Sequence, residues 1–160
     1  MLDTIELSRL INYNEVSKPY FEGVFAYDQF LSDTSRKKDK RNLIFVVNTD
    51  PSWKNGTHWL LVFVKGNKVF FVDSLGFPPS HYGLEKKLQS FGRQIIHIDN
   101  INLQCQFSTA CGAYCIYFSY HLSRGKSFEH ILKMFRRFSP DYNDMLVVEF
   151  CREQNERMLA

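Results

Sequence analysis

The sequence predicts an α+β domain in which helices flank a central mixed β-sheet. Residues 43–48 form a compact β-branched and aromatic run that is typical of a buried strand. Two further apolar runs, residues 58–65 and 68–73, follow in the middle of the chain, whereas helical periodicity dominates the last third. Central strands with helices segregated around them are typical of the α+β class.

Length and composition indicate one domain, which we assign to residues 1–160. A chain of this size buries about 70% of its unfolded surface, enough for a single core. Hydrophobic residues make up 44% of the chain and aromatic residues 16%, so the core should be dense. The chain has no apolar run of the roughly 18 to 20 residues that span a bilayer, and no secretory leader follows Met1. We therefore expect no membrane association and no secretion.

The central apolar runs predict a β-hairpin. Gly66-Asn67 separates residues 58–65 from residues 68–73, and this dipeptide suits a two-residue turn between antiparallel strands. A turn of this length fixes the register of the pair.

That register brings an imidazole next to a carboxylate. If Lys65 faces Lys68, then Leu60 faces Asp73, and His58 lies two residues further along the same face. Diagonal neighbours of this kind are about 7 to 8 Å apart at the backbone, a gap that two side chains can span. Hairpin geometry alone therefore predicts contact between His58 and Asp73.

Other segments of the chain carry helix and strand signals of their own. Apolar residues recur at helical spacing, and turn or capping residues mark where these segments begin and end. We expect a short helix after Asp3 or Thr4, a helix at 84–91, a strand at 94–98, a helix through 131–138, and a helix from Ser139-Pro140 to about residue 156.

A helix with Cys111 in its first turn supplies the candidate nucleophile. Apolar residues recur there at i, i+3, i+4, i+7 and i+11, with Ser108 or Thr109 as the expected N-cap and Gly125 as the expected end. Free N–H groups and the helix dipole favour an anion in the first turn, and a thiolate is such an anion. Gly112 follows Cys111 and is expected to leave room for a substrate.

Each of these residues has a structural explanation when taken alone. A cysteine on an apolar helix is more often a packing residue, and we assign Cys115 and Cys151 to that role. His58 and Asp73 could likewise be strand-end residues with local partners. Cys111 differs because a matching base, with a carboxylate to orient it, is available in the hairpin. We therefore predict a triad of His58, Asp73 and Cys111.

An acyl-transfer site also needs donors for the oxyanion, typically a backbone N–H at the nucleophile and a side-chain amide. Gln104 and Gln106 both lie in the loop before Cys111, and the spacing alone does not choose between them. Trp59, beside His58, is able to fix the plane of the imidazole and to exclude water. The expected substrate-binding residues are Gly56, Trp59 and Gly112.

The four cysteines favour neither a disulfide framework nor a metal site. Cys105, Cys111, Cys115 and Cys151 include no C-x-x-C pair, and no secretory signal accompanies them. The paired short spacings of structural zinc sites are missing as well. We expect reduced thiols, no metal and no required cofactor.

One run of basic residues is the conspicuous source of the mild net charge of +3. A solvated loop is the ordinary explanation of such a run, and contact with nucleic acid is the alternative. The residues that would bind DNA in that case are Arg36, Lys37, Lys38, Lys40 and Arg41.

Five short motifs occur in order along residues 19–118. They are Pro19-Tyr20-Phe21-x-Gly23, Val47-Asn48-Thr49, Gly56-Thr57-His58-Trp59, Asp73-Ser74-Leu75-Gly76-Phe77, and Gln104 leading to Ser108-Thr109-Ala110-Cys111-Gly112. Together they resemble the adenovirus endopeptidase (adenain) family, which shares a larger clan with the SUMO-specific proteases. In this clan the histidine precedes the acid and the cysteine, whereas papain-like enzymes have the cysteine first.

The resemblance implies a role for each matched side chain. His58 corresponds to the base, Asp73 to its acidic partner and Cys111 to the nucleophile of a cysteine endopeptidase. Gln104 corresponds to the oxyanion donor, because it stands seven residues before Cys111 (111 − 104), as in the adenoviral pattern.

The same resemblance implies a biological setting. The family cuts viral precursor proteins after Gly-Gly or Gly-x, because a narrow channel excludes side chains beside the thiol. We accordingly expect capsid or core precursors as substrates, non-specific DNA as a further partner, and a monomeric enzyme from a virus, a virophage or a virus-like transposon. Its expected location is the virion and the host nucleus or a cytoplasmic virus factory.

The sequence also departs from the adenoviral pattern. Asp73 stands where adenoviral enzymes usually have Glu and the SUMO proteases have Asp. The chain has no cysteine near Arg93 and Gln94, where the adenoviral enzyme attaches its activating peptide. We therefore expect no disulfide-linked peptide, while activation by DNA or by a non-covalent peptide stays open.

Three other functions are compatible with the same residues. The first is a deconjugating protease for SUMO or ubiquitin-like modifiers. The second is an acyltransferase with an acyl-coenzyme A donor, although the sequence offers no sign of a nucleotide pocket. The third is a non-catalytic binding module in which the three side chains are core residues.

Overall fold

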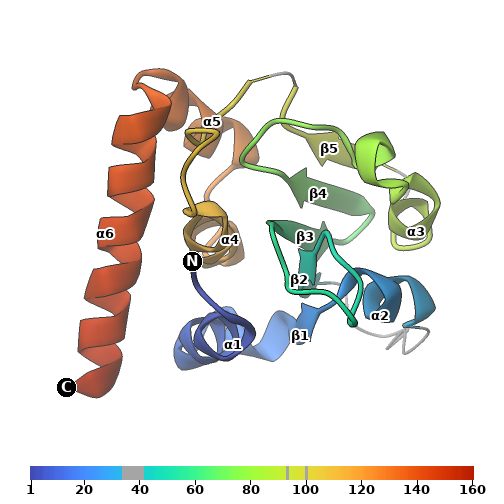
Figure 1. Ribbon diagram of the computed structural model, residues 1–160, viewed down its shortest axis with the longest axis horizontal. Helices are drawn as coiled ribbons and strands as arrows, with labels where there is room; N and C mark the ends of the chain where they lie inside the picture. Colours follow the sequence, from blue (N-terminus) through green and yellow to red (C-terminus); the bar gives the residue numbers. More distant parts are fainter. Residues whose placement is uncertain (34–41, 93, 100) are drawn as a thin grey trace.

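The computed structural model describes residues 1–33, 42–92, 94–99 and 101–160 (Figure 1). The basic run from Arg36 to Arg41 lies outside these residues, so DNA binding by that run stays a prediction. None of the helices in the described ranges is both long enough and apolar enough to cross a membrane.

Five strands form one mixed sheet, and their order in space is their order in the chain (Figure 1). β1 (Phe21–Phe25) is parallel to β2 (Asn42–Asn48), and β4 (Lys68–Val72) is parallel to β5 (Gln94–His97). β3 (Trp59–Lys65) runs antiparallel to both β2 and β4. The predicted α+β class with a central mixed sheet is confirmed.

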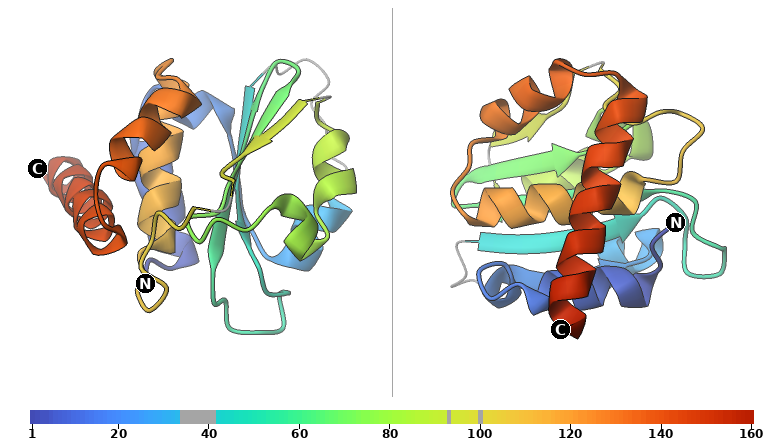
Figure 2. Two further views of the ribbon diagram at one scale, coloured as in Figure 1. Left: turned by 90° about the horizontal axis from the view of Figure 1, so that it is seen from above. Right: turned by 90° about the vertical axis from the view of Figure 1, so that its left-hand side faces the viewer.

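One face of the sheet is covered by two layers of helices (Figure 2). α1 (Thr4–Tyr13), α4 (Cys111–Ser123) and α5 (Phe128–Arg136) lie next to the strands. α6 (Pro140–Leu159) packs on α4 and α1 and forms the outer layer. α4 is therefore enclosed between the sheet and α6. This position explains why α4 itself has apolar residues on nearly every side.

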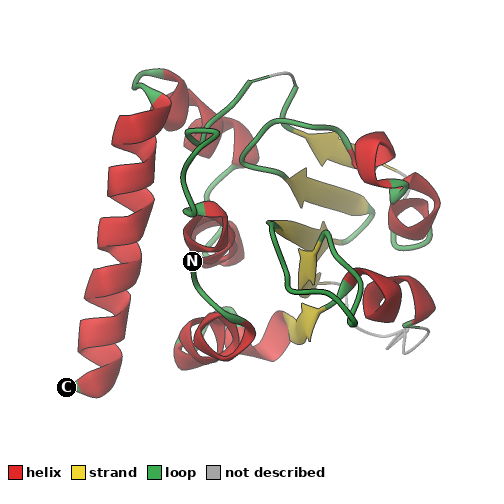
Figure 3. Cartoon of the chain, viewed as in Figure 1, coloured by secondary structure: helices red, strands yellow, loops and turns green. Residues whose placement is uncertain are grey.

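The opposite face carries shorter helices (Figures 2 and 3). α2 (Tyr27–Ser32) and α3 (Glu85–Gln89) cover it, and two 3-10 turns, η1 (Lys18–Tyr20) and η2 (Pro79–Tyr82), join the elements around the sheet. Only one face is thus thickly covered, and the chemistry predicted for Cys111 lies on that face.

Alternation along the strands divides the core into two clusters. In β2, Ile44 and Val46 pack towards α1 and α4. Leu43, Phe45 and Val47 of the same strand pack towards α2 and α3. Because both faces are buried, the strand is a continuous apolar run without alternating polar residues.

The hairpin predicted from the sequence is present. Lys65 pairs with Lys68, and the ladder keeps this register to the end of β4. Gly66 has φ +58°, the left-handed backbone that a tight hairpin turn requires and that glycine adopts without steric cost.

Two helices begin at the expected caps. The Asp3 side chain accepts from the Ile5 and Glu6 N–H groups, while the Glu6 carboxylate accepts from the Asp3 N–H. At the start of α6, the Ser139 hydroxyl accepts from the Tyr142 N–H at 3.3 Å. Both local signals were sufficient because capping needs only residues within one turn.

The expected cap of α4 was wrong. Ala110 occupies the N-cap position and no side chain caps this helix, while Ser108 accepts from the Ala110 N–H at 3.4 Å just before it. The segment reaches α4 in a turn conformation, which places Ser108 and Thr109 outside the cap position. The first-turn N–H groups next to Cys111 are consequently not consumed by a capping side chain.

One strand and one α-helix, β1 and α2, have no counterpart in the sequence prediction. β1 is half-buried along its whole length, and its pairing with β2 is interrupted between Phe21 and Gly23. α2 has six residues, too few to show a helical period. α6 also continues to Leu159, beyond the expected end near residue 156.

Replacing Ser139 by Ala should lower the free energy of unfolding by about 1 kcal/mol, the usual cost of losing an N-cap side chain. The Tyr142 N–H loses its acceptor in this variant. Urea denaturation followed by far-UV circular dichroism measures the loss. Asn155→Ala is the matched control, because Asn155 is exposed in the same helix and alanine favours helix. Equal stability of Ser139→Ala and the wild type would contradict the capping role.

Candidate active site

The open end of the hairpin brings His58 and Asp73 into contact. His58 immediately precedes β3 and Asp73 immediately follows β4. The distance from His58 Nε2 to Asp73 Oδ1 is 2.7 Å, typical of a charge-assisted hydrogen bond. Only 12% of the His58 side chain and 1% of the Asp73 side chain are exposed. The register set by the turn therefore accounts for this contact.

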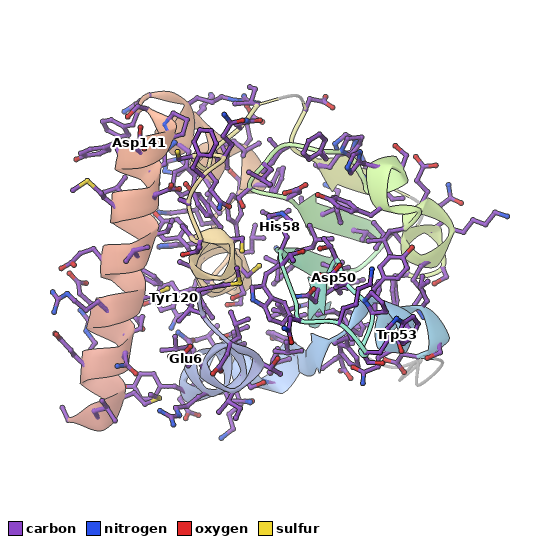
Figure 4. The ribbon with its side chains drawn as sticks, viewed as in Figure 1. Glu6, Asp50, Trp53, His58, Tyr120 and Asp141 are labelled. Atoms are coloured by element: carbon purple, nitrogen blue, oxygen red, sulfur yellow. The ribbon has the colours of Figure 1, made fainter. Side chains whose placement is uncertain are left out.

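Cys111 is the first residue of α4 and lies beside the same imidazole. The residue is 2% exposed, and its side chain is near enough to the His58 ring to raise the pKa of that ring. Because Nε2 of His58 is engaged by Asp73, Nδ1 is the nitrogen left to exchange a proton with the sulfur. In Figure 4, His58 lies between α4 and the central strands. The three side chains thus meet in one place.

The surroundings of His58 raise the pKa of its ring. Burial of the ring opposes its protonation, but hydrogen bonds with Asp73 and Cys111, and the negative charges of both, raise the pKa of His58 from 6.5 to about 9. The imidazolium is therefore the main form at neutral pH. A positively charged ring and the N-terminus of α4 both stabilise a thiolate.

The Asp73 carboxylate has two further donors. The Leu75 N–H donates to Oδ1 at 2.9 Å, and the Tyr82 hydroxyl donates to Oδ2 at 2.5 Å. Tyr82 is itself held in η2, where its carbonyl accepts from the Tyr27 hydroxyl at 2.6 Å. Burial and the adjacent Asp73 raise the pKa of Tyr82, so its hydroxyl stays protonated. These bonds satisfy a buried charge and turn it towards His58.

Tyr82 is a residue of the site that was not predicted from the sequence. It lies in an irregular segment after β4, where neither a period of 2 nor one of 3.6 can reveal which way a side chain points. The contact depends on how η2 folds back over the end of the hairpin, which is a tertiary feature.

Gln104 is held at both ends of its carboxamide. Its Oε1 accepts from the Ser74 hydroxyl at 2.5 Å, and its Nε2 donates to the Ser108 carbonyl at 2.9 Å. A carboxamide nitrogen carries two N–H groups, so a second donor remains for an oxyanion. Gln104 is buried whereas Gln106 is exposed, which favours Gln104 as the oxyanion donor.

Close packing explains the two glycines assigned to substrate binding. A Cβ on Gly56 would lie 2.2 Å from Asn48 Nδ2, so a larger residue would force the Asn48 side chain to shift. A Cβ on Gly112 would lie 3.2 Å from Leu2 Cβ and 3.4 Å from Trp59 Cδ1. The space beside Gly112 is thus filled by the protein, contrary to the expectation that it is left open for a substrate.

A cavity of about 380 Å³ is lined in part by Trp59, the residue that follows His58. Trp59, Gly56 and Leu2 are among its lining residues, together with the end of β1 and the loop between β2 and β3. The Trp59 indole N–H donates to the Leu2 carbonyl at 3.0 Å, which fixes the ring in this wall. This cavity is the candidate path for a substrate, with Trp59 and Gly56 in its wall.

A larger cavity has none of the three triad residues in its wall, although Ala110, the neighbour of Cys111, lines it. Its volume is about 740 Å³, and its lining residues come from α1, α4, α6 and the segment before α4, without His58, Asp73 or Cys111. Cavity size therefore does not mark the candidate active site, whereas the meeting of the three side chains does.

Cys115 and Cys151 are buried thiols. Burial raises the pKa of Cys115 well above its ordinary value and that of Cys151 to about 12, so both thiols stay protonated at neutral pH. All four cysteines are free thiols. Within the described ranges, no three His, Cys, Asp or Glu side chains gather in a way that could hold a metal ion.

Comparison with known proteins gives matches in structure only. No family model and no curated protein sequence matches this chain. ChlaDub1 from Chlamydia trachomatis superposes with a TM-score of 0.66 over 99% of this chain and 93% of its own, at 14% identity. The ASFV pS273R protease superposes with a TM-score of 0.59 over 90% of this chain and 65% of its own, at 15% identity. The SUMO protease Ulp1 superposes with a TM-score of 0.50 over 94% of this chain and 78% of its own, at 17% identity.

The chain has the fold of these three proteins. Its five-stranded mixed sheet with flanking helices is therefore the architecture found in SUMO protease Ulp1 and the ASFV pS273R protease. At identities of 14–17% the likeness concerns the fold, so the activity must be argued from the site.

If the site hydrolyses peptide bonds, the raised pKa of His58 predicts an alkaline limit to that reaction. As the pH rises through about 9, the ring loses the proton that it must give to the leaving amine, and kcat/KM should fall. Asp73→Asn removes a charge that stabilises the imidazolium, so this limit should move to lower pH. The pH profile of a fluorogenic peptide amide with Gly-Gly before the scissile bond measures both. An identical alkaline limit of kcat/KM in the variant and the wild type would show that Asp73 does not act on His58.

Tyr82→Phe should lower the free energy of unfolding by about 1.5 to 3 kcal/mol, the range for a hydrogen bond to a charged group. The phenyl ring keeps the packing and removes only the donor to Asp73. Tyr142→Phe is the control, because Tyr142 is 45% exposed. Urea denaturation in the wild-type and Asp73→Asn backgrounds gives a double-mutant cycle. The same loss in both backgrounds would show that the Tyr82 hydroxyl acts elsewhere.

Proposed function

We propose that the protein is a cysteine endopeptidase that cuts precursor proteins after small residues. The observation that carries the proposal is the position of the His58 ring, which contacts Asp73 on one side and Cys111 on the other. Gln104, fixed by Ser74 and Ser108, supports the same assignment as an oxyanion donor.

The proposed reaction begins with the ion pair of the Cys111 thiolate and the His58 imidazolium. The thiolate attacks the peptide carbonyl carbon, and the carbonyl oxygen becomes an oxyanion that accepts from Gln104 Nε2 and the Cys111 N–H. The C–N bond then breaks as His58 gives its proton to the leaving amine, which leaves a thioester on Cys111.

Hydrolysis of the thioester restores the enzyme. Neutral His58 takes a proton from a water molecule, whose oxygen attacks the thioester carbon while the same donors hold the new oxyanion. The C–S bond breaks, the carboxylic acid product leaves, and the thiolate and imidazolium form again. Asp73 keeps the ring oriented and stabilises its positive charge in both halves of the cycle.

The motif resemblance supports a narrower proposal for the substrate. It favours viral capsid or core precursors cut after Gly-Gly or Gly-x, with a monomeric enzyme in the virion and in the host nucleus or a virus factory. Non-specific DNA, or a peptide held without a disulfide, is the proposed activator.

A deconjugating protease is the second candidate. The fold is shared with the SUMO protease Ulp1, and Trp53 offers an exposed aromatic surface on the loop that leads to His58 (Figure 4). This side chain is 76% exposed, and a folded partner that docked there would cover it. An acyltransferase or a non-catalytic module has no comparable observation in its favour.

The substrate class can be tested directly. SUMO and ubiquitin carrying a C-terminal electrophile should label Cys111 if the protein is a deconjugating protease, and should not label it if it is a maturation endopeptidase. Incubation with candidate structural precursors, with and without DNA, followed by mass spectrometry of the products, tests the endopeptidase directly.

Cys111→Ala should abolish hydrolysis of the Gly-Gly peptide amide while the thermal unfolding midpoint stays close to that of the wild type. Cys151→Ala is the matched control, since it removes a buried thiol and should keep activity. Iodoacetamide at neutral pH should modify Cys111 faster than Cys151, because a thiolate is the reactive form. Residual hydrolysis by Cys111→Ala, or equal labelling of the two thiols, would end the assignment.

A further inference from the structure

The loop between β5 and α4 carries Gln104, and side chains from α4 and α6 hold the peptide groups on both sides of this residue. The Cys105 N–H donates to Asp144 Oδ2 at 3.2 Å. The Leu103 carbonyl accepts from the Tyr114 hydroxyl at 2.9 Å. These are the two peptide units that flank the Gln104 Cα atom.

Asp144 and Tyr114 are also joined to each other. The single hydroxyl proton of Tyr114 lies between Leu103 O and Asp144 Oδ1, the latter at 2.8 Å. Asn143, next to Asp144 in α6, donates through Nδ2 to the same Leu103 carbonyl at 3.2 Å and to the Phe135 carbonyl at 3.0 Å. One connected network therefore binds α4, α5 and α6 to the loop.

Burying a carboxylate in this place costs desolvation free energy unless hydrogen-bond donors compensate for the lost water. Asp144 is 9% exposed, and Tyr114 and Asn143 are each 1% exposed. The Cys105 N–H and the Tyr114 hydroxyl supply donors to this carboxylate in place of the lost solvent. The bond to the Cys105 N–H is directed at one particular peptide group of the loop.

We propose that Asp144, with Tyr114, is a positioning residue for the oxyanion donor Gln104. Fixing both flanking peptide planes fixes the direction of the Gln104 Cα–Cβ bond, while Ser74 and Ser108 fix the far end of the carboxamide. The inference rests on the proposed function, and it assigns to α6 a part in catalysis although α6 supplies no residue to the triad.

The expected kinetic signature differs from that of a purely structural tether. Loss of one oxyanion donor costs about 10²- to 10³-fold in kcat. Asp144→Asn keeps the volume but weakens the bond to the Cys105 N–H, so we expect a fall in kcat of about 10- to 100-fold with KM little changed. Asp141→Asn, an exposed carboxylate in the first turn of α6, is the matched control and should keep the wild-type kcat (Figure 4).

Two further measurements separate positioning from general damage. Alkylation of Cys111 by iodoacetamide forms no oxyanion, so its rate should be the same in Asp144→Asn and the wild type. In a Gln104→Ala background, Asp144→Asn should cause little additional loss of kcat, because the donor that it positions is already gone. Tyr114→Phe should likewise lower kcat and leave the rate of Cys111 alkylation unchanged. This variant tests the positioning role if Asp144→Asn does not fold.

The outcomes distinguish this inference from the proposed function. If the wild type hydrolyses the Gly-Gly peptide amide and Cys111→Ala does not, but the Asp144 and Tyr114 variants keep full kcat, only the positioning role is overturned. The positioning role is also overturned if the kcat losses of Asp144→Asn and Gln104→Ala are fully additive, or if Asp144→Asn slows the alkylation of Cys111. Either result would show that the network acts on the whole fold and not on Gln104. A wild type without thiol-dependent hydrolysis overturns both.

Discussion

The hydrogen bond between His58 and Asp73 depends on a carboxylate that is almost wholly removed from water. Burying such a charge costs several kcal/mol unless donors replace the lost solvent. Three donors do so here: the imidazole, the Leu75 N–H and the Tyr82 hydroxyl. Two of them bond to Oδ1 and one to Oδ2, so both oxygens of the carboxylate are held, and the imidazole is oriented by its bond to Oδ1. The raised pKa of His58 follows from the same arrangement.

The sulfur is placed by different means. Cys111 begins a helix that is enclosed by the sheet and by α6, and close-packed surroundings leave such a helix little freedom to shift. The base and its carboxylate therefore come from a hairpin, and the nucleophile from a separate layer that packs on it. Packing between the two layers thus decides whether proton exchange can occur, although no packing residue takes part in the chemistry.

The sequence was most informative where interactions are local. The Gly66-Asn67 turn fixed a register from which the meeting of His58 and Asp73 could be deduced, because strand pairing obeys a period of two. The starts of α1 and α6 were likewise predictable from their caps. The cap of α4 was not, because the preceding segment turns in a way that depends on tertiary contacts with Ser74 and Asp144.

The roles of Tyr82, Asp144 and Tyr114 lay beyond the sequence for a related reason. In each contact at least one partner lies in an irregular segment. The path of such a segment cannot be predicted from hydrophobic periodicity. The fold class was predictable because it depends on the order of elements, whereas the supports of the site depend on how loops cross between them.

The order of the elements in the chain has a consequence for biosynthesis. A nascent polypeptide leaves the ribosome from its N-terminus, and the hairpin can form as soon as residue 73 has emerged, because its contacts are local. The sulfur at position 111 follows later, and α6, which closes over α4, later still. A partly translated chain that ends before residue 111 can thus hold the imidazole and the carboxylate of the candidate site without its sulfur.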